Sequence, residues 1–214
     1  MSAPHVVRVG TVVSTQDVAF DLAARGAADR TVVLADHQTA GRGRQGRTWH
    51  DAPGASLLVS ILVRPALDAR SLPWLSYVAA IAVAEALQEA TGLAPRLKWP
   101  NDVLVDDRKV AGILLQTRLS ASTRGDGAAT ASNGPSTQRA GLAAALTVIG
   151  VGINLEPGSV TPELADRATS VREAGGRPVD REALLGAVVA ALEVWRARLE
   201  REGPEPIRRR WLAL

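Results

Sequence analysis

Strand-like and helix-like apolar segments alternate along this chain, and their order limits the folds that it can adopt. Residues 57–63 (LLVSILV) form a continuous apolar run of strand length, which Arg64 and Pro65 close. Residues 71–90 place apolar side chains at helical spacing, and Gly92 ends that pattern. The complete order, β-α-β-β-α-β-β-β-β-α, predicts an α+β domain in which helices back a mixed β-sheet. The other predicted strands cover residues 6–13, 31–35, 96–98, 103–105, 110–117 and 146–155, and the other helices begin after Ser14 and at Asp180.

The length and the absence of long apolar segments predict one soluble domain. A chain of 214 residues suffices for a single large domain, which we expect to cover residues 1–214. Residues 120–141 are mostly Ala, Ser, Thr, Gly, Asn and Gln, and such a segment buries too little apolar surface to offset its ordering entropy. We therefore expect a disordered loop there. No leader-type start and no apolar run of membrane length is visible, which favours a cytoplasmic protein.

The charge composition is unusual because nearly all of the basic residues are arginines. Of 25 basic residues, only Lys98 and Lys109 are lysines, and the formal net charge is +3. The sequence pI of about 10.1 reflects a lack of groups that titrate above neutrality, since the chain has no Cys and one Tyr. The high pI is therefore poor evidence for nucleic-acid binding. The absence of Cys excludes disulfides, thiolate catalysis and Cys-ligated metals.

Residues 41–49 (GRGRQGRTW) form the segment with the strongest chemical signature. The glycines match a dinucleotide fingerprint, but that fingerprint must open a helix, and here turn-forming residues follow. Glycines allow the backbone to approach a ligand closely, and the guanidinium groups of Arg42, Arg44 and Arg47 bind phosphate or carboxylate. The segment therefore predicts a flexible anion-binding loop; the alternative is a solvated basic loop.

Both lysines stand in segments that suit a ligand site. Lys98 opens KWPND, a turn between two short strands, and Lys109 opens KVAGILL, a strand whose Gly112 admits a close ligand. A chain that otherwise uses arginine would retain lysine where a compact ammonium must fit between a carboxylate and a phosphate. Chance placement of two lysines is the alternative.

Two further segments are compatible with either a structural or a binding role. Gly150 and Gly152 in residues 149–155 (IGVGINL) indicate a bulge or a backbone wall against a ligand. Residues 14–16 (STQ) are a helix cap or a polar contact to a ligand. His5, His37 and His50 lack metal-ligand spacing, no phosphate-binding P-loop or nucleophile-elbow motif occurs, and the arginines at 208–210 indicate a solvated helix end.

Taken together, five segments resemble the catalytic domain of biotin protein ligases over essentially the whole chain. They are STQ (14–16), QTAGRGRQGRTW (38–49), KWPNDV (98–103), RKVAGILLQ (108–116) and VIGVGINL (148–155). The resemblance implies the fold shared with class II aminoacyl-tRNA synthetases. It also implies condensation of biotin with ATP, accompanied by Mg²⁺, to biotinyl-5′-adenylate. Biotin would then pass to a lysine of the biotin carboxyl carrier domain of an acetyl-CoA or acyl-CoA carboxylase.

The same resemblance implies roles for individual residues. Lys109 and Arg44 would be catalytic, lying between the biotin carboxylate and the α-phosphate, and Gly152 would belong to the backbone wall. Biotin would be bound by Ser14, Thr15, Gln16, Gln38, Gly41, Arg42, Gly43, Arg44, Lys109, Gly112 and Gly150. ATP would be bound by Arg44, Arg47, Trp49, Asn101, Asp102, Lys109 and Asn154. No protein ligand for a metal is implied.

The chain also departs from the fuller family pattern. Few residues precede Val6, so we expect no N-terminal winged helix and no DNA binding; a C-terminal SH3-like barrel is also expected to be absent. We expect no membrane contact and a monomer or weak homodimer. The alternatives are a lipoate or octanoate ligase, a non-catalytic basic module that binds nucleic acid, and a pseudo-enzyme that sequesters biotin.

Overall fold

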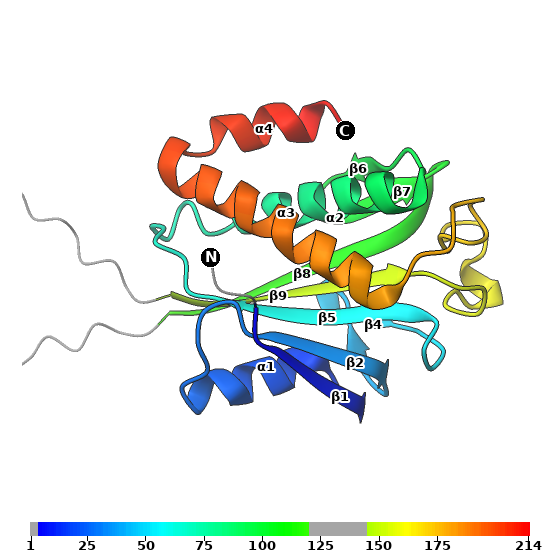
Figure 1. The fold of residues 1–214 in the computed structure, drawn as a ribbon, viewed down its shortest axis with the longest axis horizontal. Helices are drawn as coiled ribbons and strands as arrows, with labels where there is room; N and C mark the ends of the chain where they lie inside the picture. The colour runs from blue at the N-terminus through cyan, green and yellow to red at the C-terminus, as the bar shows by residue number, and fades with distance from the viewer. Residues whose placement is uncertain (1–3, 120–144) are drawn as a thin grey trace, which may run out of the picture.

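A seven-stranded mixed β-sheet forms the centre of the fold (Figure 1). The computed structural model describes residues 4–119 and 145–214, so the loop predicted at residues 120–141 lies outside the described residues. The strands are β1 (Val6–Val12), β2 (Val32–Gln38), β5 (Ser56–Val63), β6 (Arg96–Lys98), β7 (Asp102–Val105), β8 (Arg108–Leu119) and β9 (Ala145–Asn154). Their order across the sheet is β1-β2-β5-β9-β8-β7-β6, with β1 parallel to β2 and all other neighbours antiparallel. The predicted mixed sheet is confirmed.

The apolar run at residues 57–63 becomes β5, an interior strand of the sheet. Every residue of β5 is buried, and the strand pairs with β2 on one side and β9 on the other. Because neither face of this strand is polar, it is stable only where other layers cover both faces of the sheet and keep them from water.

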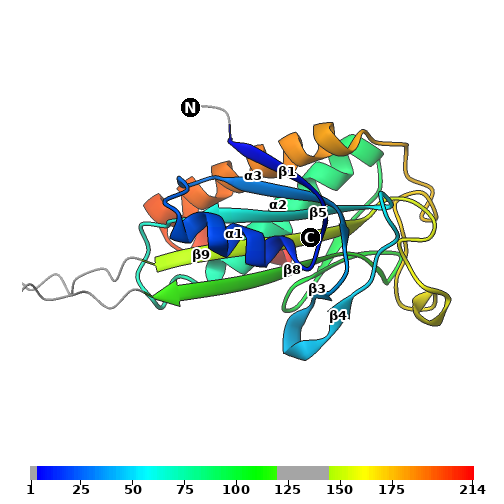
Figure 2. The same cartoon turned by 90° about the horizontal axis from the view of Figure 1, so that it is seen from below.

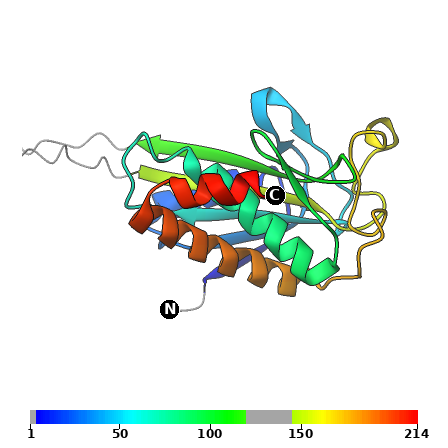
Figure 3. The ribbon, with the colours of Figure 1, turned by 90° about the horizontal axis from the view of Figure 1, so that it is seen from above.

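Helices cover the two faces unequally. Helix α1 (Thr15–Ala24) lies on one face, over a small apolar cluster that includes Phe20, Val33 and Val148. Helices α2 (Trp74–Thr91) and α3 (Arg181–Glu202) cover the opposite face, and α4 (Glu205–Leu212) packs against both (Figures 1 and 3). The main hydrophobic core lies between the sheet and these helices.

Helix α2 is the most buried helix because it lies between the sheet and other helices. All residues from Val78 to Ala84 are buried, and the helix ends as predicted at Gly92, whose φ of +75° is in the left-handed region. Its Glu85 accepts a hydrogen bond from Trp195 Nε1 at 2.7 Å and another from Arg210 Nε at 2.7 Å. The prediction of a solvated helix end at 208–210 is therefore wrong for Arg210. Its carboxylate partner lies on another helix, which the local sequence does not reveal.

An ion-pair network attaches α3 to the turn before β2. Arg196 is buried and donates to both carboxylate oxygens of Asp29, at 3.1 and 2.9 Å. It also pairs with Glu193 and Glu200 on its own helix. Burial raises the pKa of Glu193, while the positive charge of Arg196 acts in the opposite direction.

The glycine- and arginine-rich segment is more ordered than the predicted loop. Strands β3 (Gly41–Arg42) and β4 (Thr48–Trp49) pair as a short hairpin, with the 3-10 turn η1 (Arg44–Gly46) between them. Figure 2 shows this β3–β4 hairpin projecting from the face of the sheet that carries α1. The hairpin was missed because two-residue strands carry no periodicity that a sequence pattern can reveal.

Within the described part of the chain, none of the helices has both the length and the apolar character that a membrane span requires.

Candidate functional site

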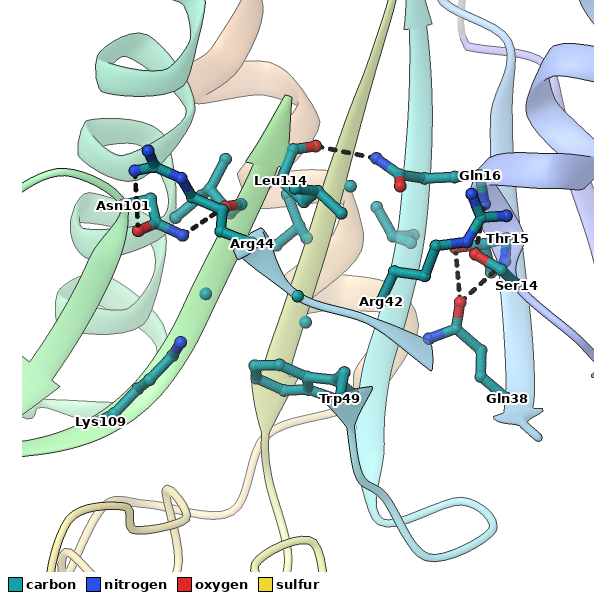
Figure 4. A pocket seen from close by; sticks show the side chains of 17 residues that line it. Ser14, Thr15, Gln16, Gln38, Arg42, Arg44, Trp49, Asn101, Lys109 and Leu114 are labelled. Carbon is teal, nitrogen blue, oxygen red and sulfur yellow. Dashed lines mark hydrogen bonds between the residues drawn. The ribbon is translucent and has the colours of Figure 1, made fainter. Parts of the chain in front are cut away.

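Most of the predicted site residues line a pocket between the start of α1, the sheet and the β3–β4 hairpin (Figure 4). The start of α1, the middle of β8 and β9, and the hairpin enclose a first pocket with about 460 Å³ of empty space up to its open mouth. This pocket is lined by Ser14, Thr15, Gln16, Gln38, Arg42, Gly43, Arg44, Trp49, Val59, Asn101, Lys109, Gly112, Ile113, Leu114, Gly150, Val151 and Gly152.

The start of α1 is held to the sheet by side-chain hydrogen bonds. Ser14 is the N-cap, and its hydroxyl accepts from the Gln16 backbone N–H at 3.3 Å. Gln38 Oε1 accepts from the backbone N–H of Thr15 at 2.8 Å and from its hydroxyl at 3.1 Å. The Thr15 hydroxyl also lies 2.8 Å from the hydroxyl of Ser60, a fully buried residue of β5. These contacts fix the N-terminus of the helix at the pocket wall.

Two glutamine amides at this wall are held in opposite orientations (Figure 4). Gln16 Nε2 donates to the Leu114 carbonyl at 2.9 Å, which leaves Gln16 Oε1 buried with no partner among the described residues. Gln38 uses its oxygen to accept from Thr15, so its Nε2 is the end left to donate. The pocket therefore presents one fixed acceptor and one fixed donor.

Two arginines of the hairpin, Arg42 and Arg44, contact polar partners on the body of the domain. Arg42 forms an ion pair with Asp17 of α1. Arg44 lies 3.4 Å from Asn101 Oδ1, and Asn101 Nδ2 donates to the Ile113 carbonyl at 2.7 Å. Asn101 thus links the hairpin to β8.

The glycines of β8 and β9 leave room for side chains of the site. A Cβ on Gly152 would lie 2.6 Å from Trp49 Cε2, and a Cβ on Gly150 would lie 2.9 Å from Gln16 Nε2. At Gly112 a Cβ would meet Lys109 Nζ at 2.9 Å. The glycine wall that was predicted to face a ligand therefore also makes room for the side chains of Trp49, Gln16 and Lys109.

A second pocket lies on the other side of Trp49 and Lys109, and both residues line both pockets. Lys109 Nζ lies 2.7 Å from Asp102 Oδ1 and 5.6 Å from the centroid of the Trp49 ring. The second pocket has about 1240 Å³ of empty space including its open side. Its cationic lining residues are Arg47, Lys98, Lys109 and Arg167, and its acidic ones are Asp102, Asp107 and Asp166.

The predicted site residues divide between the two pockets. Arg47, Asp102 and Asn154 line the second pocket, whereas Arg44 and Asn101, predicted to bind ATP, line the first. Gly41 lines neither pocket and lies within the hairpin, opposite Trp49, where a Cβ would meet the Trp49 carbonyl oxygen at 2.7 Å. Asn154 is buried, and its Nδ2 donates to the Thr169 carbonyl at 3.1 Å.

Sequence reasoning missed the apolar lining of the first pocket and most of the second. Val59, Ile113 and Val151 were recognised only as strand residues, although their apolar character is a usable signal for a pocket wall. The segment after β9 has no periodicity or motif and gave no signal. It contributes Ser159, Val160, Leu164, Asp166, Arg167 and Ala168 to the second pocket.

Comparison with known proteins identifies the family. Residues 9–125 match the profile of the biotin/lipoate A/B protein ligase family. A biotin–[acetyl-CoA-carboxylase] ligase of Paracoccus denitrificans is 39% identical over 187 residues, which cover 85% of this chain and 69% of that protein. The chain belongs to the biotin/lipoate A/B protein ligase family.

Other ligases of this family resemble the chain in sequence and in fold. The bifunctional ligase/repressor BirA of Bacillus subtilis (strain 168) is 31% identical over 97% of this chain, which spans 58% of that protein's length. A solved biotin protein ligase from Aquifex aeolicus, in complex with biotin and ATP, superposes with a TM-score of 0.74 at 28% identity. That superposition covers 97% of this chain and 76% of the solved one. The ligase fold expected from the sequence is confirmed.

Proposed function

We propose that this chain is an ATP-dependent biotin protein ligase. It forms biotinyl-5′-adenylate from biotin and ATP and then transfers biotin to a lysine of a biotin carboxyl carrier domain. Membership of the ligase family and the names of the relatives from Paracoccus denitrificans and Aquifex aeolicus support the proposal. The geometry must decide between biotin and lipoate, because the family name covers both.

The orientations of the Gln16 and Gln38 side-chain amides favour biotin over lipoate. Among residues 4–119 and 145–214, Gln16 Oε1 is buried without a partner, and Gln38 Nε2 is the end of its amide that is left to donate. The ureido ring of biotin has N–H donors beside a carbonyl acceptor, which matches one acceptor and one donor in an otherwise partly apolar pocket. Lipoate and octanoate have no polar group at that end, so binding either would leave Gln16 Oε1 buried and unpaired.

The position of Lys109 suits adenylate formation. A biotin carboxylate oxygen attacks the α-phosphorus of ATP, the bond to the pyrophosphate oxygen breaks, and pyrophosphate leaves. Both reactants are anions, so a cation between them lowers their repulsion and stabilises charge that develops at phosphorus. Lys109 borders both pockets, and Arg44 lines the first beside the hairpin. We assign these two residues to that role, with Arg42 near the carboxylate.

The second pocket suits ATP. Arg47, Lys98 and Lys109 supply positive charge for phosphates, and the Trp49 ring offers a surface on which adenine stacks. We place Asp102 and Asn154 on the same nucleotide side. ATP binds with Mg²⁺, which neutralises phosphate charge. Within the described residues no group of three or more His, Cys, Asp or Glu is placed to hold a metal, so we assign the ion to phosphate oxygens and water.

Transfer completes the reaction. The neutral amine of the carrier lysine attacks the carbonyl carbon of the mixed anhydride, the bond from that carbon to the phosphate oxygen breaks, AMP leaves, and the amine proton passes to solvent. Lys109 donates to the carbonyl oxygen as negative charge develops there. We propose a carboxylase carrier domain as the protein partner, because two relatives are biotin–[acetyl-CoA-carboxylase] ligases. We also propose a cytoplasmic monomer or weak homodimer that binds neither DNA nor membranes.

A substrate panel tests the proposal. Full-length protein is incubated with ATP, an apo carrier domain, and biotin, lipoate or octanoate, and the carrier is analysed by mass spectrometry. The proposal expects one biotinyl group on the acceptor lysine and no lipoyl or octanoyl group. Modification by lipoate or octanoate alone would instead assign the chain to the lipoate branch of the family.

A further inference from the structure

The base of the β3–β4 hairpin is closed by a side-chain contact that the proposed chemistry does not use. His37, near the end of β2, and Asp51, two residues after β4, approach with Nδ1 3.0 Å from Oδ2. The Asp51 side chain is 0% exposed and that of His37 is 24% exposed. The contact therefore joins the two legs of the hairpin at the sheet.

The chemistry of this contact is defined by the carboxylate. An ionised carboxylate can only accept hydrogen bonds, so the Nδ1–H of His37 is the donor in either protonation state of the ring. Asp51 Oδ1 is buried and has no partner among the described residues. Burying a carboxylate without a partner costs free energy of folding, and in the described chain His37 is the side chain that pairs with Asp51.

The two legs of the hairpin are anchored differently. The first leg is held by main-chain hydrogen bonds from Thr39 N to Val12 O and from Ala40 N to Val13 O, at 2.8 and 3.0 Å. On the second leg, the next main-chain hydrogen bond to β2 after Trp49 is from Gly54 N to Asp36 O, at 3.0 Å. In the described chain Asp51 provides the side-chain tie to β2 between those two points.

The second leg forms one wall of the second pocket. Arg47, Thr48, Trp49 and His50 all line that pocket, and His50 directly precedes Asp51. The first pocket takes Gln38, Arg42 and Gly43 from the first leg and shares only Trp49 with the second leg. Main-chain hydrogen bonds and Thr15 hold the first leg independently of Asp51. Loosening Asp51 therefore disturbs the nucleotide side of the site more than the biotin side.

We infer that His37 and Asp51 are a positioning pair that holds the second leg of the hairpin in place for ATP binding. The identity of the ligand as ATP rests on the proposed function. The inference about the hairpin itself does not, because the contact and the burial of Asp51 are independent of any ligand.

The pair is tested in full-length protein with the variants His37→Ala, Asp51→Ala, Asp51→Asn and the double variant His37→Ala/Asp51→Ala. Calorimetry gives the Kd values of ATP and biotin, and limited trypsin digestion gives the cleavage rate after the exposed Arg47. Glu182→Ala is the control, because it breaks a 2.9 Å Arg8–Glu182 ion pair that lies outside the hairpin.

We expect Asp51→Ala to raise the ATP Kd by about tenfold while the biotin Kd changes by less than about twofold, with faster cleavage after Arg47. Asp51→Asn keeps an acceptor for His37 and should retain most of the ATP affinity. His37→Ala strands a buried carboxylate, so the double variant should be more stable than His37→Ala alone.

Equal losses of ATP and biotin affinity in Asp51→Ala, or unchanged ATP affinity and unchanged cleavage, would overturn the inference. If His37→Ala does not fold, Asp51→Asn and the double variant still decide it. If the unmodified protein binds neither ATP nor biotin, the proposed function fails, while trypsin cleavage still tests the pair.

Discussion

Replacing Gln16 with Met should weaken biotin binding while leaving the free energy of unfolding nearly unchanged. In the protein, the Gln16 amide, at the wall of the first pocket, donates to Leu114 O at 2.9 Å, and its Oε1 is buried with no partner in the part of the chain that the structure describes. Met keeps a similar length but removes both polar atoms. The folded state loses one hydrogen bond and also loses one orphaned acceptor, and these effects oppose each other at about 1 kcal/mol each. The free energy of unfolding should therefore change little.

Biotin binding should change far more than stability. Without Gln16 Oε1, a ureido N–H would be buried without an acceptor, at a cost of about 1–3 kcal/mol, or about 5- to 150-fold in Kd. Isothermal titration calorimetry with biotin and octanoate, together with thermal unfolding, measures both effects. Gln88→Met, at an exposed position of α2, is the matched control. A biotin Kd within about twofold of the unmodified protein, or an equal loss of octanoate affinity, would refute the reasoning.

Three further substitutions test residues that line the first pocket. Lys109→Ala and Arg44→Ala should each lower biotin adenylation at least about tenfold, about 1.4 kcal/mol, measured as pyrophosphate release; unchanged rates in both would remove them from the mechanism. Gly152→Ala places a Cβ 2.6 Å from Trp49 Cε2 and must displace the indole, so adenylation should fall by about tenfold or more. Gly10→Ala, whose Cβ would meet nothing within 4 Å, should retain full adenylation, and equal loss in both variants would contradict this account.

The sequence predicted the long elements well because their patterns report burial directly. Helix α2 needed only apolar spacing and Gly92 as its stop, and its observed bounds, Trp74–Thr91, begin three residues after the predicted start at residue 71. Helix α1 was marked by the cap at Ser14. Such signals are local, so a sequence shows them without any knowledge of distant contacts.

The parts that the sequence did not predict depend on contacts between distant segments. His37 and Asp51 are 14 positions apart and belong to no motif, so nothing local indicates that they meet. Helix α4 begins after Pro204 and itself contains Pro206 and the arginines at 208–210, and its position depends on Arg210 reaching Glu85, 125 positions away. The second pocket depends on the irregular segment after β9, which has no periodic pattern.

The orientation of the two glutamines shows what the structure adds to a prediction that names only residues. The sequence pointed to Gln16 and Gln38 as ligand contacts, but an amide can present either its oxygen or its nitrogen. Only the hydrogen bonds to Leu114 and Thr15 determine which atom of each side chain faces the pocket.

Biotin-dependent exchange of pyrophosphate into ATP by the full-length protein tests the central claim most directly, because it needs both pockets and the residues between them but no carrier. The account predicts exchange that requires biotin and is not supported by lipoate or octanoate. Folded full-length protein that catalyses no biotin-dependent exchange, or that exchanges with lipoate or octanoate in place of biotin, would contradict it.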